Sequence, residues 1–180
     1  NIIAERAVKK TLKPVKLGSP TPLMHRKNVK LISTGNIEDN LDLVADADLI
    51  IEVVLEKIEV KHDVFNKIDK FRKKDSIITS NTSTIPRKQL VEGMSKAFAR
   101  DFMITHFFNP PRYLRLLEIV AGGEVSPEKI ELVSKFCDIN LGKEVVICND
   151  TPGFIGNRIG TYWTLIGMIE AIKLGLTVEE

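Results

Sequence analysis

The chain has 180 residues, of which 43% are hydrophobic and 28% are charged, a composition typical of a folded globular protein. Its 26 Lys and Arg against 24 Asp and Glu give a net charge of +2, and the basic residues are scattered, which argues against a nucleic-acid partner. No apolar run approaches the roughly eighteen residues of a membrane span, so we predict none.

The two cysteines, Cys137 and Cys148, lie in apolar stretches without CxxC spacing. This pattern disfavours both a metal site and a disulfide framework. We therefore expect no bound metal and a reducing, cytoplasmic setting. The sequence starts without Met and without the pattern of a signal peptide, so we expect it to be an interior piece of a longer chain.

The first predicted element is a helix whose apolar positions recur at helical spacing until Pro14, followed by a loop at LGSPTP. Helical patterns also occur at Ile58–Phe71 and at Pro127–Leu141, the latter with Ser126 as N-cap. Short apolar and β-branched runs predict strands at residues 29–32, 48–54, 76–80, 102–108, 116–120 and 144–148. Strands that alternate with helices indicate an α/β fold with a Rossmann-like, mainly parallel sheet.

The last predicted helix runs from Thr151 to Gly175 and is mostly apolar. So much apolar surface indicates burial against another domain or subunit. The final residues, TVEE, form a capping-box pattern, so we expect a further helix to start there. We expect residues 1–147 to form one α/β domain and residues 148–180 to start an all-α domain.

Polar side chains follow the predicted strand at residues 76–80, where the sequence reads Ser80-Asn81-Thr82-Ser83. In open parallel sheets, ligands bind at the carboxyl ends of the strands, so these side chains are well placed to contact a substrate. Taken alone, they are better interpreted as an ordinary polar turn before the next helix.

His106 ends another predicted strand, and Glu118 follows twelve residues later within the apolar run LLEIV. A carboxylate bonded to one ring nitrogen fixes the tautomer of an imidazole and raises the basicity of the other nitrogen. A carboxylate in an apolar strand needs a partner, and His106 is the obvious one. Taken separately, a core histidine and a solvent-facing carboxylate on an edge strand are the better interpretations.

Asn157 falls in the first turns of the last predicted helix, where its amide can donate a hydrogen bond into the cleft between the two expected domains. The simpler interpretation, on this segment alone, is that Asn157 and Arg158 solvate the helix or bind a neighbouring carboxylate.

Five motifs, in this order, resemble the 3-hydroxyacyl-CoA dehydrogenase family: ADLIIEVVLEKIEVKHDVF, SNTSTIP, HFFNPP, LLEIV and DTPGFIGNRI. The resemblance runs from about Gly35 to the last residue, and TGNIEDNL and GTYW further resemble the long bacterial type, which carries an enoyl-CoA hydratase-like region. It implies an NAD-dependent enzyme of fatty-acid β-oxidation that oxidises a (3S)-3-hydroxyacyl-CoA to the 3-oxoacyl-CoA. It also implies a homodimer or a part of a larger multifunctional chain.

Carried over by position, the resemblance makes His106 the general base and Glu118 the group that orients it. Ser83 would bind the substrate hydroxyl or carbonyl, and Asn157 would help to hold the reacting oxygen as charge develops. Further residues match positions that the family uses near the nicotinamide and its ribose: Glu56, Lys61, Asn81 and Asn109.

The family pattern departs from this sequence at the glycine-rich loop, because no strand followed by G-x-G-x-x-G is present. The glycines of GFIGNRIG lie in a predicted helix, so we interpret them as helix-packing residues. We expect a truncated cofactor domain and an inactive fragment. Two alternatives stay open: an NAD-dependent dehydrogenase of a hydroxy acid without CoA, and a non-catalytic binding or structural protein on this fold.

Overall fold

A computed structural model of the protein describes residues 2–13, 22–23 and 25–177. These residues divide into two compact units. One comprises the described residues up to Ala47 together with Val64–Lys73, and the other comprises Asp48–Asp63 together with the residues from Lys74 onward. The loop expected at LGSPTP and the helix expected at TVEE lie largely outside the described residues.

The first unit contains helices and no strand among its described residues: α1 (Ile2–Lys10), η1 (Arg26–Leu31), η2 (Leu41–Asp46) and most of α2 (Ile58–Phe71). The sequence pattern predicted α1 and α2 correctly. The strand predicted at residues 29–32 is wrong, because this segment forms part of the 3-10 helix η1 and none of the residues of η1 is buried. Apolar and β-branched residues favour a strand only where a half-buried sheet surface receives them.

The second unit is built on a five-stranded sheet. In order across the sheet, the strands are β1 (Leu49–Glu52), β2 (Ile77–Ser80), β3 (Phe102–Phe107), β4 (Leu116–Ala121) and β5 (Glu144–Ile147). All neighbouring strands are parallel except β3 and β4, which pair antiparallel. The predicted Rossmann-like, mainly parallel sheet is therefore confirmed.

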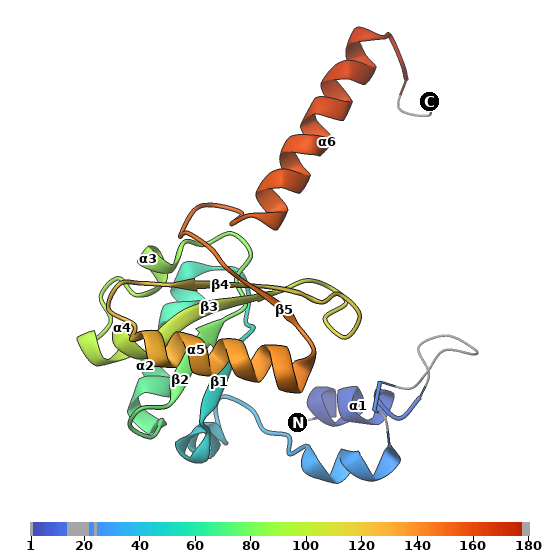
Figure 1. Ribbon diagram of the computed structural model, residues 1–180. Helices are drawn as coiled ribbons and strands as arrows, with labels where there is room; N and C mark the ends of the chain where they lie inside the picture. The colour runs from blue at the N-terminus through green and yellow to red at the C-terminus, as the bar shows by residue number, and fades with distance from the viewer. Residues whose placement is uncertain (1, 14–21, 24, 178–180) are drawn as a thin grey trace. The chain divides into compact units, whose positions relative to one another are not determined.

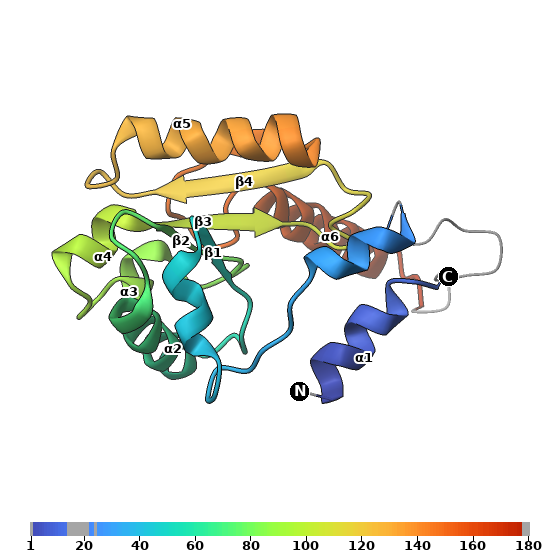
Figure 2. The same ribbon diagram turned by 90° about the horizontal axis from the view of Figure 1, so that it is seen from below.

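Helices cover both faces of this sheet, with α5 (Pro127–Lys135) along one face and α3 (Arg87–Leu90) and α4 (Lys96–Asp101) on the other (Figures 1 and 2). Under α5 lies a buried apolar cluster: Ile77, Met103, Leu117, Ile119, Val125, Val133 and Cys137. On the opposite face Phe98 of α4 stacks on Phe102 of β3, with ring centroids 5.2 Å apart. Successive residues of β3 thus point into two buried layers, which explains its continuous apolar run.

The ends of the last two helices follow from local hydrogen bonds. Ser126 caps α5 as predicted, since its Oγ accepts a hydrogen bond from the Lys129 N–H. A π-helical turn at Phe136–Asn140 then continues the chain close to the predicted end. The last helix, α6 (Gly156–Lys173), begins later than Thr151, where the sequence pattern placed its start.

The late start of α6 has a backbone cause. Gly153 and Phe154 have φ angles of +74° and +46°, which turn the chain before the helix can begin. Gly175, with a φ of +70°, ends the helix as predicted. None of the residues of α6 is buried, so its burial against another domain or subunit stays a prediction. Within the described ranges, every helix is too short or too polar to cross a membrane.

Candidate active site

His106 and Glu118 face each other across the antiparallel pair of β3 and β4. Both are buried, with 3% and 1% of their surface exposed, and Glu118 Oε2 lies 2.8 Å from His106 Nδ1. The predicted contact is confirmed. The alternative of a solvent-facing carboxylate on an edge strand is wrong, because β4 lies between β3 and β5.

The second carboxylate oxygen of Glu118 binds the start of α6. Glu118 Oε1 accepts hydrogen bonds from the N–H groups of Ile155 at 3.0 Å and Gly156 at 2.7 Å. The N-terminus of a helix carries unpaired N–H groups and a partial positive charge, both of which favour a carboxylate. Glu118 therefore joins the imidazole of His106 to the first turn of α6.

The other ring nitrogen of His106 faces a hydroxyl group, because Ser83 Oγ lies 3.1 Å from His106 Nε2. The rings of Phe108 and Phe154 flank the imidazole, with centroids at 4.5 Å and 5.5 Å. A carboxylate at Nδ1 favours the tautomer that carries its proton there, which leaves the lone pair on Nε2. The site thus places a proton acceptor next to a hydrogen-bonding hydroxyl.

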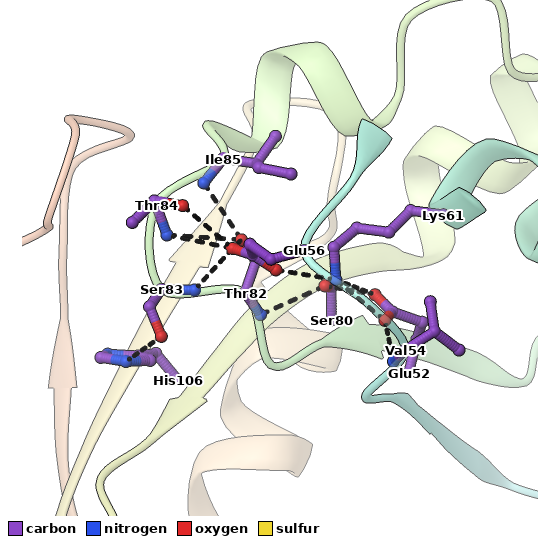
Figure 3. A network of polar contacts seen from close by, with 10 residues as sticks. All are labelled: Glu52, Val54, Glu56, Lys61, Ser80, Thr82, Ser83, Thr84, Ile85 and His106. Carbon is purple, nitrogen blue, oxygen red and sulfur yellow. Dashed lines mark hydrogen bonds and ion pairs between the residues drawn. The ribbon is translucent and has the colours of Figure 1, made fainter. Parts of the chain in front are cut away.

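Glu56 follows β1 and binds the loop that follows β2 (Figure 3). Its Oε1 accepts hydrogen bonds from the hydroxyl groups of Thr82 and Thr84 and from the N–H groups of Ser83 and Thr84. Burial acts to raise the pKa of Glu56, but hydrogen bonds from Thr82 and Lys61 and the charge of Lys61 outweigh it and lower this pKa to about 2. The loop therefore wraps around a carboxylate that is ionised at neutral pH.

Lys61 lies between two carboxylates, and only 1% of its side chain is exposed. Its Nζ is 2.9 Å and 3.0 Å from the two oxygens of Glu52 and 3.1 Å from Glu56 Oε2. The Ser80 hydroxyl donates to Glu52 Oε2 at 2.6 Å. An ammonium group has three donors, so these three oxygens occupy them.

Sequence reasoning missed Glu52 and Asp150. Glu52 is a lone carboxylate in an apolar strand, the same signal that identified Glu118, and it pairs in register with Ser80. The two oxygens of Asp150 accept hydrogen bonds from the N–H groups of Arg87 at 2.7 Å and Lys88 at 2.8 Å. Asp150 thereby ties the segment before α6 to the start of α3.

The remaining residues expected near the cofactor and substrate follow β2 and β3 or belong to the first turn of α6. Asn81 Oδ1 accepts a hydrogen bond from the Phe107 N–H at 2.9 Å, which links the ends of β2 and β3. Asn109 is exposed just after β3. Asn157 is half-buried in the first turn of α6, next to the glycine that binds Glu118.

The two cysteines are free and buried. Burial, followed by the charge of Glu118, raises the pKa of Cys148 from 9.0 to about 11. In the part of the chain that the structure describes, no three His, Cys, Asp or Glu side chains are grouped as a metal site requires.

Comparison with protein families gives a match over most of the chain. The model of the 3-hydroxyacyl-CoA dehydrogenase NAD binding domain matches residues 3–151. A probable 3-hydroxyacyl-CoA dehydrogenase of Deinococcus radiodurans is 42% identical over 180 residues, which cover all of this chain and 51% of that protein. A putative fatty acid oxidation complex trifunctional enzyme of Rickettsia felis is 51% identical over 143 residues, which cover 79% of this chain and 20% of that protein. The chain therefore spans about half or less of these relatives.

A solved structure with the same fold is that of M. tuberculosis FadB2. It superimposes with a TM-score of 0.81 at 26% sequence identity, over 98% of this chain and 60% of that one.

Proposed function

Because the chain belongs to the 3-hydroxyacyl-CoA dehydrogenase family, we propose that the full-length protein oxidises a (3S)-3-hydroxyacyl-CoA to the 3-oxoacyl-CoA. The matching region is the NAD binding domain of that family, so the cofactor is NAD. The fatty acid oxidation relative supports a role in β-oxidation. The observation that carries the proposal is His106, with Glu118 at Nδ1 and the Ser83 hydroxyl at Nε2.

In the proposed reaction, His106 Nε2 removes the proton from the C3 hydroxyl of the substrate as hydride leaves C3. NAD, when bound, accepts that hydride. Glu118 stabilises the imidazolium that forms, because its carboxylate is in contact with Nδ1. Ser83 donates a hydrogen bond to the reacting oxygen, and the Asn157 amide supports the same oxygen from α6.

The side chains at the carboxyl ends of β1 to β3 fit the nicotinamide end of NAD in part. Asn109 is exposed, and 40% of the Glu56 side chain is exposed, so both are accessible to a ribose or an amide. Asn81 is half-buried beside them, with its orientation fixed by the Phe107 N–H. Lys61 fits less well, because its ammonium group is buried and bound by carboxylates.

We also propose that residues 1–147 belong to the cofactor domain and that residues 148–180 start a helical domain. The exposed apolar surface of α6 supports such a neighbour or a homodimer. The trifunctional relative supports a place within a larger multifunctional chain. The buried, free cysteines support a reducing, cytoplasmic setting.

The test is NADH formation by the full-length protein with 3-hydroxybutyryl-CoA, longer 3-hydroxyacyl-CoA esters and free 3-hydroxybutyrate. We expect kcat/KM for the CoA esters to exceed that for the free acid by at least about a hundredfold, because remote binding energy of the CoA portion aids catalysis. Equal values would favour a dehydrogenase of a hydroxy acid without CoA. A protein that binds NAD without turning over any of these substrates would favour a non-catalytic role.

A further inference from the structure

A continuous set of polar contacts runs from the buried Lys61 to the histidine of the proposed active site (Figure 3). Lys61 binds Glu56 Oε2, and Glu56 Oε1 accepts the N–H of Ser83 at 3.2 Å. The hydroxyl of the same serine contacts His106 Nε2. Ser83 is therefore fixed at two points, its backbone by Glu56 and its side chain by the imidazole.

Thr82 lies at the centre of this set and is 1% exposed. Its hydroxyl donates to Glu56 Oε1 and accepts the N–H of Ile85 at 3.0 Å and of Thr84 at 3.4 Å. One hydroxyl thus closes the turn that carries Ser83 and attaches this turn to Glu56. Without it, the turn would lose two internal hydrogen bonds and one of its contacts to Glu56, which help to determine where the Ser83 hydroxyl points.

Lys61 holds the Glu56 carboxylate in the position from which it binds the loop. Its ammonium group is bound by Glu52 and Glu56, and Glu52 is itself held by Ser80. The Glu56 carboxylate therefore has one oxygen on a buried cation and the other on the loop. These contacts lie within the protein, so they are separate from any contact that the exposed part of Glu56 makes with the cofactor.

We propose that Thr82 and Glu56 are positioning residues that hold the Ser83 hydroxyl against His106 Nε2, with Lys61 as the buried counter-ion of this anchor. The inference rests on the proposed dehydrogenase function. Misplacement of a reacting group by about 1 Å can slow an enzyme by roughly a hundredfold, so the loop anchor affects the rate of the chemical step.

The test compares Thr82→Val, which removes the hydroxyl at nearly constant shape, with Thr82→Ser, which keeps it, in the full-length protein. We expect Thr82→Val to lower kcat by about tenfold to a hundredfold, with KM for NAD changed by less than about twofold. Thr82→Ser should restore most of kcat. A loss confined to KM for NAD would overturn the proposal, because it would indicate a cofactor contact.

The matched control is Thr105→Val. Thr105 is a buried threonine of β3 whose hydroxyl donates to Thr79 Oγ1 at 2.8 Å, on the sheet face opposite His106. We expect Thr105→Val to lower thermal stability about as much as Thr82→Val does and to leave kcat unchanged. If Thr82→Val lowers stability but leaves kcat within about twofold of the wild type, the role of Thr82 is structural only and the proposal is overturned.

If Thr82→Val does not fold, Thr84→Val takes its place. Thr84 is exposed, and its hydroxyl donates to Glu56 Oε1 at 3.1 Å. We expect kcat to fall by about twofold to fivefold, as for one weakened hydrogen bond of the anchor, and an unchanged kcat would overturn the proposal. If the wild type forms no NADH, the proposed function is refuted. If the wild type is active and the Thr82 and Thr84 variants have the same kcat, only this inference is refuted.

Discussion

Replacing Glu118 by Gln changes a carboxylate that accepts three hydrogen bonds, one from the histidine of the site and two from the start of α6. Gln has only one acceptor oxygen, so it can accept hydrogen bonds either from His106 or from the start of α6. We expect it to face the two backbone N–H groups of Ile155 and Gly156. Its NH2 group then faces His106 Nδ1 as a donor, which forces the ring proton to Nε2 and removes the lone pair that accepts the substrate proton.

The size of the effect follows from the contact that is lost. A hydrogen bond to a charged group contributes about 1.5–3 kcal/mol, and two opposite charges about 4 Å apart attract by about 4 kcal/mol at an effective dielectric constant of about 20. Both values describe the same contact between Glu118 and the His106 imidazolium, so they are not added. We expect a loss of about 3–4 kcal/mol in the transition state, which lowers kcat by about 10²- to 10³-fold.

The assay is steady-state NADH formation by the full-length protein with a saturating 3-hydroxyacyl-CoA. The control is Glu144→Gln in the neighbouring strand, because the Glu144 side chain is 74% exposed and its pair with Arg115 is long, at 3.5 Å. We expect this control to match the wild type. Glu118→Gln with more than half of the wild-type kcat would refute the orienting role of Glu118.

Three further predictions concern groups around the site. Glu56→Gln should lower resistance to urea at neutral pH. The difference in urea resistance between wild type and variant should shrink as the pH falls from 4.5 towards about 2, because a lowered pKa stabilises the folded state only while that carboxylate is ionised. A difference that grows on acidification would contradict this. Cys148 in the native protein should resist iodoacetamide at mildly alkaline pH, since burial raises its pKa to about 11, and peptide mapping that finds rapid alkylation would show the opposite. Asp150→Ala should reduce the free energy of unfolding by about 1–2 kcal/mol, because the N–H groups of Arg87 and Lys88 lose their acceptors. An unchanged melting temperature would contradict this role of Asp150.

The centre of the sheet could be predicted from the sequence because β2, β3 and β4 are mostly buried and carry continuous apolar runs. The wrong prediction of a strand at residues 29–32 also follows from relying on the local residue pattern. This run has the residue types of a strand, yet the residues of η1 within it are not buried, and a local pattern does not reveal whether a partner strand exists. The start of α6 could not be predicted either. It depends on the positive φ of Phe154, a conformation that a local pattern does not reveal for a non-glycine residue, and on Glu118, which accepts the first N–H groups from 37 residues before Ile155.

The contact between His106 and Glu118 could be predicted because a carboxylate in an apolar strand requires a partner. The same reasoning applied to Glu52 would have predicted a partner for it, which in the structure is Lys61. The role of Glu56 was beyond reach from local patterns, since the loop residue Ser83 that it binds lies 27 positions away. The polar turn after β2 suited a simple cap as well as a site, and its contact with His106 through Ser83 could not be predicted from local patterns.

Single-turnover NADH formation by His106→Gln in the full-length protein, with saturating NAD and 3-hydroxybutyryl-CoA, tests the proton transfer most directly. We expect the rate to fall by about 10²- to 10⁴-fold, the usual contribution of a general base, while the dissociation constant for NADH changes little. A His106→Gln rate within about tenfold of the wild type would contradict His106 as the group that removes the hydroxyl proton.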